Sequence, residues 1–334
     1  MPFYNVWIEH VALDLNQTFT YRHDAALERG MRVKVPFNHR ELVAIVMEAC
    51  EQPDDPSRIK DVIEVLDEQP LLNEELFGLA AYMADTYVSS MMSCFKAMLP
   101  PALRPATRRA SVVYEDWFVA GDSTQPLTKK GQETWERLKD ALPMKASAFR
   151  KLAKSHARSF LERGYLRVEK RRKESALDLP EKEDQTFALT DEQRDAIAQI
   201  SASSHDVFLL HGVTGSGKTE VFLRLAEQAL SENRQVLFLV PEIGLTPMMI
   251  ARVRSRFRQN IAIYHSQMSA SEKYDQYEKV RTGEVQIVVG TRSACFMPFS
   301  NLGLILMDEE HDTSYKQDMM PKYHTRDLVL WRGA

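Results

Sequence analysis

The segment Gly212–Thr219 constrains this chain most, because its spacing, G-x-x-x-x-G-K-T, is typical of a phosphate-binding loop. Val207–Leu210 before it is predicted to be a short buried strand, and Val221–Leu230 after it a helix. Glycines let backbone N–H groups face phosphate oxygens, and the positive end of the helix adds to the attraction. A glycine-rich turn without a ligand is the alternative. The residues predicted to bind nucleotide here are Gly212, Val213, Thr214, Gly215, Ser216, Gly217, Lys218, Thr219 and Glu220.

Two acidic residues after another apolar strand supply the second half of a triphosphatase site. Leu304–Met307 is followed by Asp308 and Glu309. We expect Asp308 and the Thr219 hydroxyl to hold Mg²⁺, and Lys218 to contact the β- and γ-phosphates as a catalytic residue. Glu309 is then placed to deprotonate the attacking water. The alternative for this pair alone is an acidic loop. The predicted cofactors are ATP and Mg²⁺.

A glutamine lies upstream of the first predicted strand. Gln193 in Leu189-Thr190-Asp191-Glu192-Gln193 is predicted to hydrogen-bond adenine, since its amide offers both a donor and an acceptor. A capped helix start has the same sequence pattern, so that alternative stays open.

Residues 186–334 alternate strands and helices, as expected for a parallel sheet flanked by helices. Besides Val207–Leu210, the predicted strands are Val236–Val240, Ile261–Tyr264, Val285–Val289 and Leu304–Met307. The predicted helices are Asp191–Ile200, Lys218–Leu230, Pro247–Phe257 and Ser271–Arg281. In such sheets ligands bind at the carboxyl ends of the strands, where the motifs above also fall.

Two further strand-end loops suggest a track for nucleic acid. Thr246 follows one strand and Arg292 another, and hydroxyl, arginine and backbone N–H groups suit phosphate contacts. Tyr315 and Lys316 begin an aromatic and basic stretch beside the acids, for which stacking on a base and simple packing are both open.

The residues before this lobe fall into segments of different composition. Residues 1–105 read as β-rich, with strands at Met31–Phe37, Leu42–Met47 and Ile59–Leu66 and a helix starting near Asn73. Residues 106–175 form a basic segment: Lys129–Lys173 holds 15 Lys or Arg against 5 Asp or Glu, in a chain of net charge −4. Helices followed by a basic strand suggest a winged helix with Arg158 and Arg163 facing DNA. The alternatives are a solvated helical surface for the charge run and, for the winged helix, a structural spacer whose helices only pack. Residues 176–185 are predicted to be a linker.

Some classes are not indicated. No apolar run is long enough for a membrane span, and Met1–Asn5 lacks the pattern of a secretory signal, so we expect the cytoplasm. Cys50, Cys94 and Cys295 are far apart, so neither a disulfide framework nor a zinc site is expected in this chain.

Five loops in order, L-T-x-x-Q, G-V-T-G-S-G-K-T-E, V-P-E-I-G-L-T, G-T-R-S-A and D-E-E-H, resemble a superfamily two helicase. Tyr315-Lys316-Gln317 and the later K-Y-H-T-R-D-L are similar to the bacterial PriA family. The resemblance implies a multidomain α/β protein: a small β-rich DNA-binding domain, a winged helix, and the first of two RecA-like parallel α/β helicase lobes. It implies an ATP-dependent 3′-to-5′ helicase that recognises stalled forks and restarts replication by primosome assembly.

The resemblance also implies contacts for the 3′ end of a leading strand. Phe19 would stack on the terminal base and Lys60 would meet a phosphate. Thr20 stands where the family has an aspartate, and Asn38 where it has a glycine. The implied partners are forked and single-stranded DNA, other primosome proteins and single-stranded DNA-binding protein, with no membrane.

The family continues beyond the point matched by Ala334, with a zinc cluster and a second lobe whose arginines complete the ATP site. We therefore expect this chain to be a fragment or truncated product that binds nucleotide weakly and hydrolyses it slowly. A fork-binding fragment without motor activity is one alternative, and a P-loop kinase or unrelated ATPase is another.

Overall fold

The computed structural model describes residues 2–9, 17–104, 114–172, 188–203, 207–213, 215–258 and 260–334. It divides into two compact units, Met1–Ala110 with Leu179–Ala334, and Ser111–Asp178. The predicted linker, residues 176–185, lies outside the described residues.

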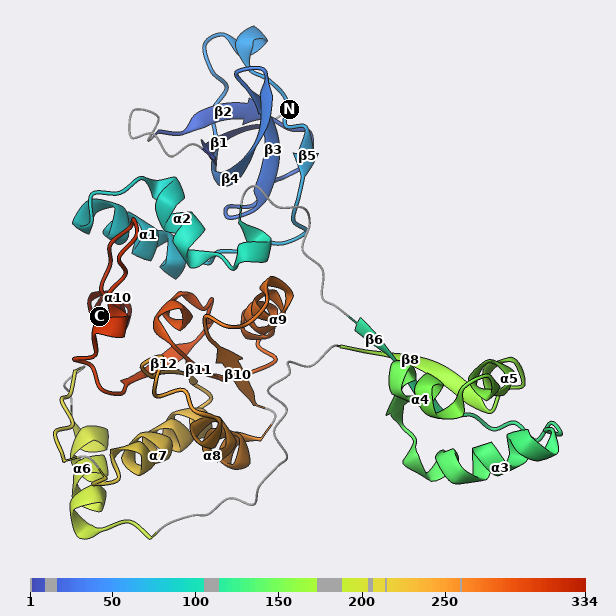
Figure 1. Ribbon diagram of the computed structural model, residues 1–334. Helices are drawn as coiled ribbons and strands as arrows, with labels where there is room; N and C mark the ends of the chain where they lie inside the picture. Colours follow the sequence, from blue (N-terminus) through green and yellow to red (C-terminus); the bar gives the residue numbers. More distant parts are fainter. Residues whose placement is uncertain are drawn as a thin grey trace. The chain divides into compact units, whose positions relative to one another are not determined.

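The first unit begins with an antiparallel sheet (Figure 1). Its strands, in the order β2-β1-β4-β3-β5, are β1 (Phe3–Ile8), β2 (Phe19–Arg22), β3 (Arg32–Phe37), β4 (Arg40–Cys50) and β5 (Glu64–Val65). Alternate residues of these strands, including Val6, Val33 and Val46, fill a small core of their own. The predicted strand Ile59–Leu66 is wrong in extent, because only Glu64 and Val65 pair with β3.

A two-residue turn joins β3 to β4. Asn38 and His39 both have positive φ, 44° and 61°. This backbone suits the twist of a hairpin, and asparagine adopts it more readily than most residues. Asn38, which stands where the resemblance implies a glycine, is therefore compatible with this turn.

Two helices follow, α1 (Glu74–Thr86) and α2 (Met91–Met98). Asn73 caps α1 by accepting a hydrogen bond from the Leu76 N–H (3.0 Å). The apolar faces of both helices share one hydrophobic core with the parallel sheet described below. Residues 1–105 were predicted as one β-rich domain, but these helices pack with the residues that follow the second unit.

The second unit has a small mixed fold. Its strands β6 (Tyr114–Ala120), β7 (Met144–Lys145) and β8 (Leu166–Arg172) form an antiparallel sheet in the order β7-β6-β8. The helices are α3 (Lys129–Leu138), α4 (Ala146–Ala153) and α5 (His156–Glu162). Aromatic rings build its core: Phe118, Phe149 and Phe160 are fully buried, and Trp135 packs edge-on against Phe160. Three helices with an antiparallel sheet have the order expected of a winged helix.

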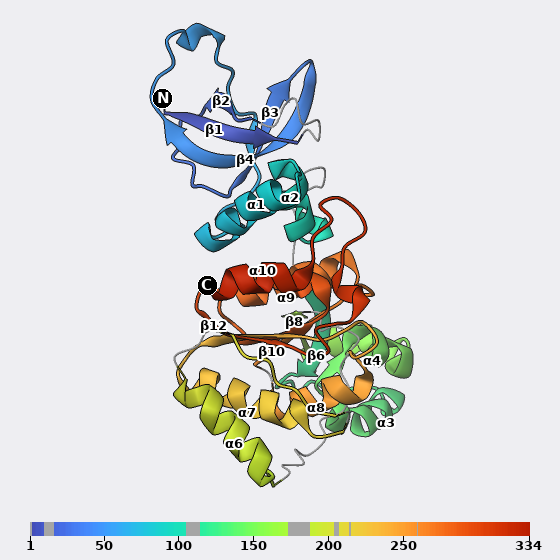
Figure 2. The same ribbon diagram turned by 90° about the vertical axis from the view of Figure 1, so that its left-hand side faces the viewer.

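The remainder of the first unit is a four-stranded parallel sheet in the order β10-β11-β9-β12. The strands are β9 (Gln235–Leu239), β10 (Ile261–Tyr264), β11 (Ile287–Gly290) and β12 (Leu302–Met307). The helices are α6 (Asp191–Ala202), α7 (Lys218–Ser231), α8 (Pro247–Phe257), α9 (Ala270–Arg281) and α10 (Thr325–Gly333). Figures 1 and 2 show α7 and α8 on one face of the sheet and α9 and α10 on the other. Mixed α/β architecture with a parallel lobe confirms the predicted fold class.

The predicted buried strand Val207–Leu210 is wrong. Among the described residues it pairs with no strand, and Val207 and Leu209 are 65% and 79% exposed. An apolar run becomes a buried strand only where a neighbour completes its ladder and other layers cover it. No helix within the described ranges is long and apolar enough to span a bilayer.

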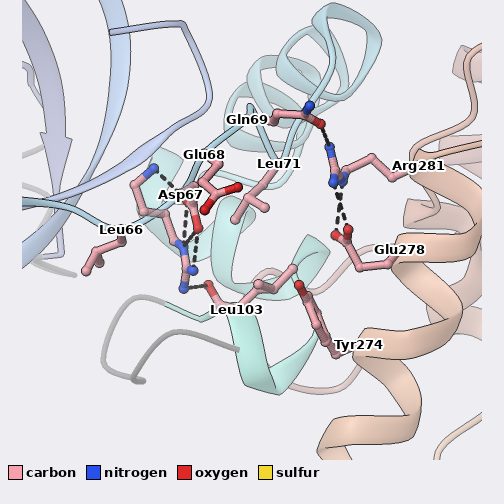
Figure 3. Close-up of a pocket in the computed structure, with 10 residues that line it drawn as sticks. Leu66, Asp67, Glu68, Gln69, Leu71, Leu103, Tyr274, Glu278 and Arg281 are labelled. Carbon is pink, nitrogen blue, oxygen red and sulfur yellow. Dashed lines mark hydrogen bonds and ion pairs between the residues drawn. The ribbon is translucent and has the colours of Figure 1, made fainter. Parts of the chain in front are cut away.

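A polar cavity of about 380 Å³ lies where the antiparallel sheet meets α9 (Figure 3). Arg32, almost fully buried, pairs with Asp67 (2.6 Å) and donates to the carbonyl of Leu103 (2.9 Å). Arg281 bridges from α9 to the Gln69 side chain (2.9 Å). The bond between Arg281 and Gln69 links the segment after β5 to α9 of the lobe, so the cavity lies inside the first unit.

Candidate nucleotide site and nucleic-acid interface

The glycine-rich loop has the backbone that its sequence requires. Gly215 and Gly217 both have φ of +83°, a conformation that side chains disfavour. Gly217 is the N-cap of α7, so the helix points its positive end into the loop. The Lys218 ammonium donates to the carbonyl of Gly212 (2.7 Å), which places it inside the loop. Thr214 lies outside the described residues.

Gln193 lies against this loop. Its Nε2 donates to the carbonyl of Ser216 (2.9 Å), while its Oε1 accepts from the Thr190 N–H (3.0 Å). The Thr190 side chain in turn accepts from the Gln193 N–H, so the two form a capping box at the start of α6. The capped-helix alternative is therefore observed. Adenine binding by the same amide stays a prediction.

The two acids lie directly after the end of β12. The Asp308 N–H extends the ladder by donating to the Leu239 carbonyl (2.9 Å), and the Glu309 N–H donates to Asp308 Oδ1 (3.1 Å). Burial and the neighbouring Glu309 charge raise the pKa of Asp308, while the Lys218 charge opposes that rise. Glu309 itself has φ of 46° and lies 3.6 Å from His311 Nε2. The Lys218 charge is thus near enough to Asp308 to affect its pKa, and Glu309 follows Asp308 directly in the chain.

These residues fit Mg²⁺ and a nucleotide. A lysine, a helix N-terminus and glycine N–H groups suit phosphates, and a half-buried carboxylate suits a hard cation. Within the described part of the chain, no group of three or more His, Cys, Asp or Glu could hold a metal alone. Magnesium here would therefore take its remaining oxygens from phosphates and water.

The Glu220 side chain, predicted at the nucleotide, points elsewhere. Its buried carboxylate pairs with Arg252 (2.8 Å) and Arg256 (2.9 Å) of α8 and with Arg224 (3.2 Å). Burial raises the pKa of Glu220, but the arginines outweigh burial and lower it overall. This network was not predicted from the sequence, although Arg252 and Arg256 have the four-residue spacing that puts side chains on one helix face.

The candidate nucleic-acid residues of the lobe differ in availability. Thr246 uses its hydroxyl to cap α8, accepting from the Met249 N–H (3.2 Å). Arg292 donates to the Lys316 carbonyl, and the Lys316 ammonium lies 5.7 Å from the centre of the Tyr87 ring. Tyr315 is fully buried and donates to the Asp308 carbonyl (2.8 Å). The packing alternative therefore describes Tyr315, whose ring has no exposed face for a base.

In the antiparallel sheet, Phe19 packs edge-on against Phe37 with ring centres 5.1 Å apart. Thr20 donates to Asn5 Oδ1 (3.0 Å). The Arg22 N–H donates to the carbonyl of Lys60 (3.0 Å), whose side chain is exposed. These bonds hold Phe19 and Lys60 on neighbouring segments, and Asn38 follows Phe37 directly.

In the second unit, both predicted arginines are already bonded. Arg158 pairs with Glu162 (2.7 Å), and Arg163 donates to the Pro126 carbonyl. Lys151 and Lys154 are exposed and have no carboxylate partner among the described residues. The sequence spacing predicts this difference. Glu162 lies four residues after Arg158 and can pair with it on one helix face, whereas neither lysine has an acid three or four residues away.

Two models of known protein families match this chain. A family model described as "DEAD/DEAH box helicase" matches residues 190–328, which include Gln193, the loop and both acids. A second, described as "3'DNA-binding domain (3'BD)" of PriA, matches residues 10–100. The chain therefore combines a helicase domain with a DNA-binding domain.

The particular family follows from whole-chain similarity. "Replication restart protein PriA" of Bacillus subtilis (strain 168) is 31% identical over 416 residues, covering 100% of this chain and 52% of that protein. The protein of the same name from Haemophilus influenzae (strain ATCC 51907 / DSM 11121 / KW20 / Rd) is 33% identical over 338 residues, covering 96% and 46%. The Synechocystis sp. (strain ATCC 27184 / PCC 6803 / Kazusa) protein is 44% identical over 210 residues, covering 62% and 24%. This chain belongs to the PriA family and spans about half the length of the first of these relatives.

Proposed function

We propose that this chain supplies the DNA-binding and nucleotide-binding parts of an ATP-dependent 3′-to-5′ DNA helicase that restarts replication at stalled forks. The observation that supports the proposal is the influence of the Lys218 charge on Asp308, which ends β12 and is followed by Glu309. It is supported by the helicase match to residues 190–328 and by relatives named for replication restart.

Each residue has a separate task in the proposed hydrolysis. Lys218 exchanges its bond to the Gly212 carbonyl for the β- and γ-phosphates. Thr219 and Asp308 would hold Mg²⁺, and the ion would supply positive charge next to the phosphates. Glu309 accepts the proton of the attacking water.

The DNA contacts are proposed on two surfaces. Thr246 and Arg292, together with Lys316, bind the strand along the carboxyl edge of the parallel sheet. Phe19, Thr20, Asn38 and Lys60 receive the 3′ end of a leading strand at a fork. The helicase direction, recognition of forks, primosome partners and a cytoplasmic location belong to this proposal.

The test compares ATP hydrolysis by the chain and by Lys218→Ala, with and without forked DNA. Losing hydrogen bonds to charged phosphates costs about 1.5–3 kcal/mol, which is roughly ten- to hundredfold in nucleotide affinity. Lys279→Ala is the control, because Lys279 pairs with Asp275 (3.4 Å) on α9. Equal nucleotide binding and hydrolysis in Lys218→Ala would refute the assignment. Equal binding of forks with and without a 3′-OH end would remove only the 3′-end pocket.

A further inference from the structure

The carboxylate of Glu220 bonds the helix α7 to the helix α8. Glu220 follows Thr219 directly in the first turn of α7, and its side chain is 4% exposed. Its two oxygens accept separate bonds from α8, Oε2 from Arg252 (2.8 Å) and Oε1 from Arg256 (2.9 Å). A buried carboxylate is stable only where such partners replace water. The position of Glu220 therefore depends on the position of α8.

A second acid of α7 shares one of these arginines. Arg256, which is also buried, donates from Nη2 to Glu227 (3.0 Å) as well as bonding Glu220. Glu220 and Glu227 are seven residues apart, so both lie on one face of α7. A planar guanidinium bonded to two acids fixes direction as well as distance, which apolar packing does not. Sliding or rotating either helix alone would break these bonds, so the ion pairs fix α7 against α8.

Each helix of this pair begins at a loop that the proposed function uses. Lys218 and Thr219 are the first two residues of α7, directly after the phosphate-binding loop. Thr246 caps the start of α8, in the loop after β9 where DNA is proposed to bind. Figures 1 and 2 show the two helices side by side on the same face of the parallel sheet. A shift of the first turn of α7 would therefore reach Thr246 through α8.

Nucleotide binding would change the bonds at the start of α7. The Lys218 ammonium now donates to the Gly212 carbonyl (2.7 Å), and the proposed function exchanges this bond for phosphate oxygens. The Glu220 N–H donates to the carbonyl of Gly217, the last residue of the loop (2.9 Å). The residue that faces α8 is thus also bonded to the loop that receives the phosphates.

We propose that Glu220 is a positioning residue that couples nucleotide binding at Lys218 to DNA binding at Thr246. Its carboxylate contacts neither ligand and acts through α8. By linkage, DNA changes the affinity for nucleotide by the same factor as nucleotide changes the affinity for DNA. The inference rests on the proposed function, since it assumes that nucleotide and DNA bind at these two loops.

The test is the ratio of nucleotide affinities with and without DNA. A fluorescent, non-hydrolysable ATP analogue is titrated into the 334-residue chain, alone and with a saturating single-stranded oligonucleotide. We expect a ratio of about fivefold or more for the unmodified chain, the lower end of typical coupling between sites. Glu220→Gln keeps the size of the side chain but removes its charge, and it should bring this ratio close to one. The ratio cancels any direct effect on nucleotide binding, and a loss of stability alone would not change it.

Two other variants complete the comparison. Glu75→Gln makes the same chemical change in the ion pair with Arg332 (2.7 Å), which lies outside α7 and α8, so it should keep the original ratio. Arg252→Gln removes a partner of Glu220 whose side chain is 37% exposed, so it costs less stability and should also lower the ratio. Arg252→Gln decides the question if Glu220→Gln does not fold.

The outcomes separate the two proposals. If the unmodified chain fails to bind the nucleotide or the oligonucleotide, the proposed function falls. If it binds both and its ratio is one, only the coupling falls. The coupling also falls if folded Glu220→Gln, or Arg252→Gln in its place, keeps the original ratio. A ratio that is lowered in these variants and kept in Glu75→Gln supports the role of Glu220.

Discussion

The bond between Arg332 and Glu75 joins the N-terminal helix α1 to the helicase lobe, and its removal has a calculable cost. The Arg332 side chain is fully buried and donates two hydrogen bonds to the Glu75 carboxylate (2.7 and 2.8 Å). It also donates to the carbonyls of Cys295 (2.5 Å) and Met297 (3.2 Å). Arg332→Ala therefore leaves a carboxylate and two carbonyls without their donor.

The magnitude follows from burial. Breaking a buried pair by removing one partner costs about 3–5 kcal/mol, since the remaining charge is poorly solvated. Glu75 keeps 30% of its side chain exposed, so water partly solvates it and the lower end applies. A loss of about 3 kcal/mol lowers the folding equilibrium constant roughly 150-fold. Arg332→Lys should recover only part of this, because an ammonium cannot form the paired bonds of a guanidinium.

The assay is urea unfolding followed by circular dichroism. Arg326→Ala on the same helix is the control, because Arg326 is 51% exposed and pairs with Glu310 at 3.3 Å. Its removal should change the free energy of unfolding by less than about 1 kcal/mol. A double-mutant cycle with Glu75→Ala isolates the pair. Equal unfolding midpoints for Arg332→Ala and Arg326→Ala would refute the reasoning.

Two further predictions concern the nucleotide site. Gly217→Ala should lower the melting temperature more than Gly283→Ala. Both glycines have positive φ, but only a Cβ at position 217 would collide with another atom, Gln193 Nε2. Equal melting temperatures would contradict the contact. The pKa of Asp308 is raised above its ordinary value of 3.8, so its contribution to stability is lost as pH rises through the folded-state pKa. Asp308→Asn should therefore be at least as stable as the original near neutral pH without Mg²⁺, measured by thermal melting, while losing the stabilisation that Mg²⁺ and nucleotide give.

Local patterns predicted most helices and strands of the lobe to within a residue or two. The predicted helix Pro247–Phe257 is α8 itself, because Thr246 caps its start and proline favours the first helical position. The strand Ile261–Tyr264 is also found as predicted. Such elements depend on hydrogen bonds among near neighbours, which the sequence displays directly.

Predictions that depended on distant partners were less successful. The apolar run Val207–Leu210 has strand composition but no paired neighbour in the described structure. Tyr315 has the aromatic ring expected of a stacking residue but is buried. Glu220 follows the loop in sequence, yet its carboxylate binds α8 arginines more than thirty residues away. A local sequence pattern does not predict which distant segment will pack against a given side chain.

The sequence by itself determined the nucleotide chemistry, because a phosphate-binding loop needs its glycines, lysine and threonine within eight consecutive residues. It also determined the order of strands and helices along the chain. Only the tertiary structure decided that α1 and α2 pack with the helicase lobe, and that the Lys218 charge opposes the rise in the pKa of Asp308. It also decided that Glu220 pairs with arginines of α8. These contacts join residues that are far apart in the sequence. They depend on how the buried surfaces of different elements pack together, which local sequence patterns do not show.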